Sequence, residues 1–529
     1  MIVHGAVAET SAVQQSSSCI PATRRGVSVR DLVLLALLTL GAFVVMGYHP
    51  GLEDDAFYLA AIKKNLNPSL FPHDSEFFRL QFQATIFDKL IALSVRVSHV
   101  PLAWMILLWQ LAAVFLLLNG CWRISRRCFL RPEAQWAAVA LVAVLLTLPV
   151  SGTAINIADQ YLHPRTLATA AILAAVVAVI DRRLWLAGAL LVVATLIHAL
   201  MACFGISFCA FLVWNLRASK AKRQSTFCAM AAGMIPLGWM FDPASDAWRQ
   251  AAATRGFYFV GRWHWYEWLG VFAPLVLVYI FRQFLRSSAS RGDGPALAPL
   301  TSALLGYGVF QTIVGLALVL PPSLERVRPF EPMRYLHLVY LLFFLCVGGF
   351  LGNYVLGRRL HRWLLLFLPL GAVMYSAQRQ LYPASAHLEL PTVAPRNAWL
   401  QAFAWIRENT PTDSLFALDP HYTTLPGEDY HAFRALAERS ALADYDKDGG
   451  MAARVPRLAP RWLKEVTALN GWRSFEVPDF EHLQKEFGIN WFVFSRTDKL
   501  GPEATDHAPP GMLCPYENQQ VRVCRLYLE

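Results

Sequence analysis

Three consecutive carboxylates, Glu53, Asp54 and Asp55, follow the first long apolar segment of the chain. Like charges in a row repel one another and lose hydration at a membrane surface, so a segment that only crosses a bilayer has little use for them. A carboxylate held there can serve as a general base or position a hydroxyl or amine acceptor. The alternative is helix capping, with Asp54 or Asp55 at the start of the helix that begins at Ala56. Spacing alone leaves both interpretations open.

A second polar segment contains Asp159, Tyr161, His163 and Arg165 and leads into another apolar run. An arginine at that place can bind a lipid phosphate, and Asp159 or His163 could coordinate a metal ion or position an acceptor. The structural alternative is an ion pair between Asp159 and Arg165 that ties the segment down.

A third segment, residues 325–335, carries Arg326, Arg328 and Arg334 together with Glu331. Guanidinium groups suit a phosphate or pyrophosphate leaving group, because they neutralise the charge that develops on it. Binding of anionic lipid headgroups without catalysis is an equally good interpretation.

His198 lies inside the apolar run 184–216. Placing an imidazole in an apolar environment costs free energy, which suggests a substrate-binding role. The alternative is a hydrogen bond between neighbouring helices.

Metal ligands are not evident beyond scattered carboxylates, so we predict no metal site and no cofactor, although the use of a divalent metal ion stays open. The segment Asp444–Gly449 resembles the start of an EF-hand loop. Position twelve of that loop should be glutamate and is Val455 here, which argues against calcium.

The elements that must position these residues are membrane helices. The chain of 529 residues is 56% hydrophobic, has a mean hydropathy of +0.38, and contains 16% charged residues, against about 25% in soluble proteins. These values predict an all-α polytopic membrane protein with about eleven transmembrane helices in residues 31–381. The predicted spans are 31–48, 101–119, 134–150, 165–180, 184–199, 200–216, 225–241, 266–283, 297–320, 333–352 and 362–381. Residues 84–98 are amphipathic and are expected on the membrane surface.

The loop charges predict the orientation. The short basic loops all fall on one side if the N-terminus, a disordered segment over residues 1–30, is cytoplasmic. The outer loops are then 49–100, 151–165, 242–265 and 321–334, and the C-terminus lies outside, as expected for the inner membrane of a bacterium. Residues 1–381 contain 32 basic and 17 acidic residues, a charge of +15 that the inner membrane surface explains. We therefore predict a membrane lipid partner and no nucleic acid.

The composition changes near Leu390, and residues 382–529 predict an extracytoplasmic α/β domain. Helices are expected at 395–409, 460–469 and 478–487, and strands at 414–418, 489–494, 511–514 and 520–527. Cys514 and Cys524 flank a turn-like segment, and in an oxidising compartment they could form a disulfide between adjacent strands. Two unrelated free thiols are the alternative.

With this topology, the chain resembles the GT-C superfamily of membrane glycosyltransferases. Members often carry an acidic pair in an Asp-Glu-Ala-aromatic-Tyr pattern in the first outer loop, to which Asp54-Asp55-Ala56-Phe57-Tyr58 is similar, except that Asp replaces Glu. The resemblance implies that Asp54 is the catalytic carboxylate and Asp55 its acidic neighbour, with Glu53 beside them. It also implies a polyprenyl-phosphate-linked sugar as donor, which Arg165, Arg326, Arg328 and Arg334 would bind, and an acceptor of unknown identity.

The main alternative is a non-enzymatic protein that translocates lipid or polysaccharide across the membrane, using the same arginines and carboxylates. A GT-C-like scaffold without activity is a third interpretation. The enzyme requires Asp54, the Asp159 segment and the Arg328 segment to converge on one place, whereas dispersed positions would favour the other two.

Overall fold

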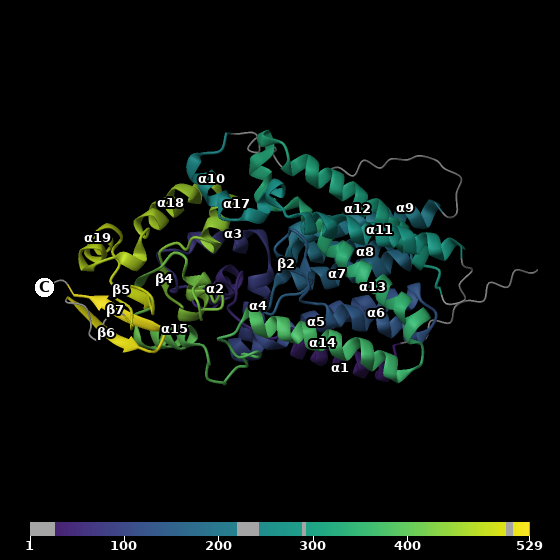
Figure 1. The fold of residues 1–529 in the computed structure, drawn as a ribbon, viewed down its shortest axis with the longest axis horizontal. Helices are drawn as coiled ribbons and strands as arrows, with labels where there is room; N and C mark the ends of the chain where they lie inside the picture. The colour runs from purple at the N-terminus through teal and green to yellow at the C-terminus, as the bar shows by residue number, and fades with distance from the viewer. Residues whose placement is uncertain (1–26, 219–242, 288–292, 504–510, 528–529) are drawn as a thin grey trace, which may run out of the picture.

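The computed structural model describes residues 27–218, 243–287, 293–503 and 511–527 (Figure 1). Long apolar helices gather at one end of the molecule, and a small sheet with its helices lies at the other end (Figure 1). Short helices that follow the first apolar helix lie between these two parts. The candidate residues of the sequence analysis fall at this junction.

Seven helical segments of the described chain are long and apolar enough to cross a membrane. They are Val29–Met46 (α1), Leu102–Cys128 (α5), Ala199–Arg217 in α9 (Ala199–Ala218), Trp265–Phe284 in α11 (Trp265–Ser287), Leu297–Val319 (α12), Pro332–Leu356 around α13 (Leu336–Leu351), and Leu360–Leu381 (α14). Three shorter apolar helices accompany them: Pro132–Val144 (α6), Pro164–Ile180 (α7) and Leu184–Ile197 (α8). The protein is therefore a multi-pass helical membrane protein.

The prediction of eleven spans is not met in full. In the predicted span 134–150, the helix ends at Val144. A short hairpin follows, in which Pro149–Val150 (β1) pairs with Ile155–Asn156 (β2). The predicted span 225–241 and residues 1–26 of the predicted disordered N-terminus lie outside the described residues. Within residues 27–30, Ser28 caps α1, and its hydroxyl accepts a hydrogen bond from the Asp31 N–H group.

The apolar run 184–216 forms two helices that meet at His198, as its length predicted. His198 has an extended backbone, and its N–H group still bonds to the carbonyl of Ala194 at the end of α8. The two helices pack against each other and against α7. The break therefore brings the His198 side chain to the ends of three helices.

The segment between α1 and α5, which the loop charges predict as the first outer loop, folds into three short helices, Asp55–Leu66 (α2), Glu76–Ala84 (α3) and Phe87–Ser98 (α4). The amphipathic segment predicted at 84–98 corresponds to α4. Its Phe87 and Ile91 are buried, and Val97 is exposed. Helix α2 is almost entirely buried through its first two turns, since it packs against α3, α4 and a helix of the C-terminal domain.

The C-terminal domain contains a five-stranded sheet in the order β4-β3-β5-β7-β6. Its strands are Leu415–Leu418 (β3), Ser440–Ala441 (β4), Trp491–Ser495 (β5), Met512–Glu517 (β6) and Val521–Leu526 (β7). Strand β3 is parallel to β4 and β5, whereas β7 is antiparallel to β5 and β6. A disulfide joins Cys514 and Cys524 across β6 and β7. The α/β character, the strand positions and the cysteine pairing agree with the sequence analysis.

Helices Ala398–Asn409 (α15) and Phe433–Ala437 (α16) cover one face of this sheet, and Val477–Phe487 (α19) covers the other. Helices Lys447–Arg454 (α17) and Ala459–Ala468 (α18) pack instead on Asp246–Ala253 (α10). Successive strand residues point to opposite faces. Phe416 therefore packs with α15 and α16, whereas Leu415 packs with α19.

Ion pairs hold the C-terminal domain against the first outer loop. Arg434 of α16 lies between Asp74 of the loop, at 2.5 Å, and Asp448 of α17, at 3.1 Å, and all three side chains are buried. Lys63 of α2 pairs with Glu438 at 2.7 Å. The domain is thus docked on the loop that carries the three acidic residues.

Candidate functional site

Asp54 immediately precedes α2, and its side chain makes no capping hydrogen bond to that helix. The capping alternative from the sequence is therefore not realised at Asp54. Its backbone N–H group donates to the hydroxyl of Tyr161, 3.3 Å away, which fixes the residue against the second outer loop. Its side chain is 26% exposed, so the carboxylate can be reached from outside.

Lys447, the first residue of α17, reaches this carboxylate from the C-terminal domain. Its Nζ atom lies 3.2 Å from Oδ1 of Asp54 and also pairs with Oε2 of Glu53. Burial would lower the pKa of Lys447, but Glu53 and Asp54 raise it, so the ammonium group stays charged. One cation from the C-terminal domain thus joins two of the three consecutive carboxylates.

The pKa of Asp54 is held well below its usual value. Burial alone would raise the pKa of this carboxyl, but the Lys447 ammonium, followed by the His163 side chain, outweighs that effect. The carboxylate is therefore ionised at neutral pH and is a weak proton acceptor. Such a group suits binding and positioning of a hydroxyl donor better than it suits storing a proton.

Asp55 has a different environment. Its Oδ2 atom accepts a hydrogen bond from the Gly51 N–H group at 2.8 Å, and burial raises the pKa of its carboxyl to about 8. Asp55 is therefore neutral at pH 7, while Asp54 is charged. Two adjacent carboxyl groups are held in different protonation states by their surroundings.

His163 faces Asp54 from the second outer loop. It is the N-cap of α7, and its Nδ1 atom accepts a hydrogen bond from the Arg165 N–H group at 3.0 Å. The proton of the neutral imidazole is therefore on Nε2, which lies 3.6 Å from Oδ2 of Asp54. Burial and then the Arg165 charge lower the pKa of His163, which keeps this imidazole neutral.

Asp159 and Arg165 form an ion pair, as the structural alternative for this segment expects. The Arg165 Nη2 atom lies 2.6 Å from Oδ1 of Asp159, and both side chains are buried. The Nε and Nη1 atoms of Arg165 are buried without a hydrogen-bond partner in the described part of the chain. The pair holds the loop in place, and the carbonyl of Asp159 accepts a further hydrogen bond from Gln110 of α5.

The arginine-rich loop contributes Arg334 and Glu331 to the same region. Oε2 of Glu331 pairs with Nε of Arg334, and Oε1 lies 2.7 Å from Arg454 at the end of α17. Arg334 is within electrostatic reach of Asp54 and Arg165. Helix α17 therefore contacts the first outer loop with its N-terminal residue and the arginine-rich loop with its C-terminal residue.

A small pocket lies beside this contact. Arg328, Glu331 and Arg334 line it together with Tyr258 and Gly152. Arg326 is not among its lining residues, since it donates to the carbonyl of Pro243 at 2.8 Å. Of the three predicted arginines of this loop, Arg328 and Arg334 therefore line the pocket, whereas Arg326 lies outside it.

His198 reaches the site indirectly. Its ring stacks on His163 with the ring centroids 6.2 Å apart, and Tyr58 meets the same imidazole edge-on at 4.8 Å. These contacts fix the orientation of His163. His198 is thus a packing neighbour of the candidate site and does not contact Asp54 directly.

The sequence analysis missed the contribution of the C-terminal domain. Lys447 lies inside the segment that resembles an EF-hand loop, but its aspartates have structural partners. Oδ1 of Asp444 accepts a hydrogen bond from the Lys447 N–H group, and Asp448 binds Arg434. No local pattern marks Lys447 or Arg454, because each is an ordinary basic residue on an amphipathic helix.

A second group of side chains, His49, Glu389 and His431, has the composition of a metal site. These residues are far apart in the sequence, and the sequence analysis did not connect them. Their ligand atoms all lie within 4.8 Å of one another.

Comparison with protein families gives one partial match. Residues 397–453 match a family model described as a domain of unknown function, DUF6798. The matched segment runs from α15 almost to the end of α17, and it includes His431, Arg434 and Lys447. Comparison with curated proteins finds no match. The matched segment therefore includes Arg434 and Lys447, which contact the loop between α1 and α5.

Proposed function

We propose that this protein is a GT-C-type membrane glycosyltransferase, which transfers a sugar from a polyprenyl-phosphate donor to an acceptor on the outer face of a bacterial inner membrane. The observation that carries this proposal is the convergence on Asp54. The carboxylate contacts Lys447, faces His163, and lies within electrostatic reach of Arg334 and Arg454. Dispersed positions for these groups would have favoured a protein without transferase chemistry.

In this proposal Asp54 binds the acceptor hydroxyl. Its ionised carboxylate accepts the hydrogen bond of the hydroxyl and orients the oxygen for attack on the anomeric carbon of the sugar. As the new C–O bond forms and the bond to phosphate breaks, the oxygen becomes strongly acidic and its proton passes to Asp54. Lys447 and the Nε2–H group of His163 hold the carboxylate in place. Asp55, neutral at pH 7, adds no charge beside it.

Arg328 and Arg334 bind the donor phosphate in the pocket that they line. As the bond between sugar and phosphate breaks, negative charge grows on the phosphate, and guanidinium groups stabilise that charge. Arg165 has a positioning role instead, because its buried pair with Asp159 shapes the loop that presents His163.

Two observations support the proposed location of the C-terminal domain outside the cytoplasm. With all eleven predicted spans crossing the membrane, the short basic loops fall on the opposite side, as the positive-inside rule expects. The disulfide between Cys514 and Cys524 also suits an oxidising compartment.

A mass-spectrometric profile of envelope glycans and lipid-linked sugars tests the proposal. A deletion strain would be complemented with wild type, Asp54→Asn, or the matched control Asp246→Asn, whose side chain is 92% exposed. We expect wild type and the control to restore a sugar modification, and Asp54→Asn to leave the donor lipid accumulated. Full restoration by Asp54→Asn would overturn the enzyme proposal and favour translocation or an inactive scaffold.

A further inference from the structure

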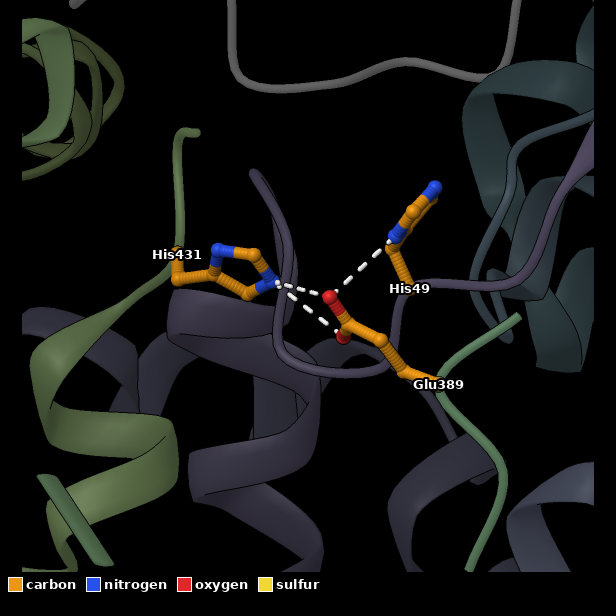
Figure 2. Close-up of side chains that lie close together, drawn as sticks. All are labelled: His49, Glu389 and His431. Atoms are coloured by element: carbon orange, nitrogen blue, oxygen red, sulfur yellow. Dashed lines mark hydrogen bonds and ion pairs between the residues drawn. The ribbon is translucent and has the colours of Figure 1, made fainter. Parts of the chain in front are cut away.

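Three residues from separate segments meet beside the candidate site. His49 follows α1, Glu389 follows α14, and His431 precedes α16. Figure 2 shows the carboxylate of Glu389 between the two imidazoles. Oε1 of Glu389 lies 3.3 Å from Nδ1 of His49 and 3.2 Å from Nε2 of His431.

Backbone contacts fix the three ligand positions. The Glu389 N–H group donates to the Tyr48 carbonyl, and the His49 N–H group donates to Gln160, both at 2.9 Å. His431 forms an isolated β-bridge with Leu52. The arrangement is therefore built by the main chain and does not depend on flexible side chains finding one another.

The imidazoles are buried but incompletely partnered. Both histidine side chains are 0% exposed, and that of Glu389 is 11% exposed. Within the described residues, neither ring nitrogen of His49 has a hydrogen-bond partner that meets geometric criteria. The ring of Tyr382 packs against His49 with the centroids 4.6 Å apart and fixes its orientation. The Nδ1 atom has only the Glu389 contact and Nε2 has no polar partner among the described residues, and a buried imidazole in this state is costly unless something binds it.

His431 carries the hydrogen-bond pattern of a metal ligand. Its Nδ1 atom lies 2.9 Å from the carbonyl oxygen of Glu428. A carbonyl only accepts, so Nδ1 holds a proton and Nε2 faces the Glu389 carboxylate. A bare lone pair there would be repelled by the carboxylate, so Nε2 carries either a second proton or a bound cation, and metal analysis of the protein distinguishes the two. Metal-binding histidines characteristically donate their second ring nitrogen to a carbonyl or carboxylate in this way.

The two separations that involve Glu389 fit a small tetrahedral ion. Ligands about 2.0–2.1 Å from zinc in a tetrahedral site are roughly 3.3 Å apart. The two contacts of Glu389 have this separation, while the third separation, between the two histidines, is at most 4.8 Å. Two imidazoles and one carboxylate are a ligand set that zinc uses, with a further position left for water or the second carboxylate oxygen.

We propose that His49, Glu389 and His431 bind one Zn²⁺ ion. The ion joins the first outer loop, the segment after the last apolar helix, and the C-terminal domain. It therefore clamps the domain in the position from which Lys447 reaches Asp54. This inference concerns metal binding and domain docking, and it holds whether or not the protein transfers a sugar.

Metal analysis of the purified full-length protein tests the site. The protein would carry an affinity tag without histidine, be stripped with a chelator, reloaded with ZnCl₂ and desalted before elemental analysis. We expect about one zinc ion per wild-type chain. Loss of an outer-shell partner alone weakens metal binding by about 10–100-fold, so His49→Ala and His431→Gln should each weaken it by at least roughly 100-fold.

Two further variants keep the test decisive. His431→Cys retains a zinc-binding side chain and should retain the ion, whereas the outer-loop control His264→Ala should bind as wild type does. Chelator should lower the Tm of wild type but leave the Tm of His431→Gln unchanged. The proposal would be overturned if reloaded wild type contains no zinc above background and its Tm does not respond to chelator. That outcome would identify the cluster as a carboxylate ion-paired with two histidines. Zinc retained by both His49→Ala and His431→Gln would overturn it as well.

Discussion

Nζ of Lys447 lies 3.2 Å from Oδ1 of Asp54, although the two residues are 393 positions apart in the sequence. The contact couples the docking of the C-terminal domain to the charge state of a candidate catalytic carboxylate. It is the basis of the first prediction.

Replacing Lys447 by methionine should raise the pKa of Asp54, because the ammonium group is the largest influence that lowers it. An opposite charge at this distance favours the ionised carboxyl, so its loss favours the protonated one. If activity requires ionised Asp54, the acidic limb of its pH profile should move to higher pH. Lys64→Met is the matched control, since Lys64 binds the carbonyls of Pro68 and Leu70. Superimposable profiles for wild type and Lys447→Met would contradict this interpretation.

Replacing Asp55 by asparagine should change how stability depends on pH. The pKa of Asp55 is about 8 in the folded protein and 3.8 for an unperturbed aspartate, as in the unfolded chain. Between these two pH values the folded state therefore binds one proton that the unfolded state has lost. The stabilising contribution of Asp55 is complete below pH 3.8 and is lost as the pH rises through about 8.

Between pH 5 and pH 9, the free energy of unfolding of wild type should therefore fall by on the order of a few kcal/mol, whereas that of Asp55→Asn should not show this fall. Thermal unfolding in detergent at both pH values measures the difference, with Asp246→Asn as an exposed control. Parallel pH curves for wild type and Asp55→Asn would show that Asp55 is ionised in the folded protein.

Replacing Arg434 by glutamine should strongly destabilise the protein. The change leaves Asp74 and Asp448 buried without their cation, and breaking a buried pair costs about 3–5 kcal/mol. Lys499→Gln is the control, because its pair with Glu476 is exposed and should contribute less than about 1 kcal/mol. Equal Tm values for the two variants would mean that the triad does not hold the domain in place.

Removing the disulfide by Cys514→Ser should lower the stability of the C-terminal domain by about 2–3 kcal/mol, as expected for the short loop that it closes. Reductant should lower the Tm of wild type and leave that of the variant unchanged. The same pair tests the location of the domain. Cys514 and Cys524 of protein taken directly from cells should react with a maleimide only after reduction if the domain faces an oxidising compartment.

Replacing Arg328 by glutamine should weaken donor binding, if the proposed function is correct. Hydrogen bonds to a charged group contribute about 1.5–3 kcal/mol, so KM for the donor should rise by roughly 10–100-fold. Arg262→Gln is the matched control, since Arg262 and Arg328 both pack over the ring of Phe259 but only Arg328 lines the pocket. An equal effect of both substitutions would point to general electrostatic attraction.

The sequence predicted the local elements well, because hydrophobic periodicity and length act over short distances. The run 184–216 was too long for one membrane span and short for two, and it breaks into two helices at His198. The strands around Phe416 and Trp491 are buried apolar runs that their composition predicted. The span at 134–150 was overestimated, since apolar composition does not reveal that the chain leaves the helix at Leu145 and forms a hairpin.

The candidate site was predicted only in part. Asp54 and His163 could be predicted because placing a charge or an imidazole beside an apolar run costs free energy, and this is visible in the local sequence. Lys447 and His431 carry no such local signal, and only the tertiary fold brings them to Asp54 and His49. Nor does any local pattern predict the Lys447 cation, which holds the pKa of Asp54 well below its usual value.

The long separation between Asp54 and Lys447 has a consequence for biosynthesis. When the ribosome has completed the last apolar helix, Asp54 has already been synthesised, whereas Lys447 and His431 have not. The nascent protein therefore passes through a stage in which its membrane helices are complete while Glu53 and Asp54 lack the lysine that pairs with them. The site matures last, and a translational stop before Lys447 would leave a membrane-inserted protein that can never assemble it.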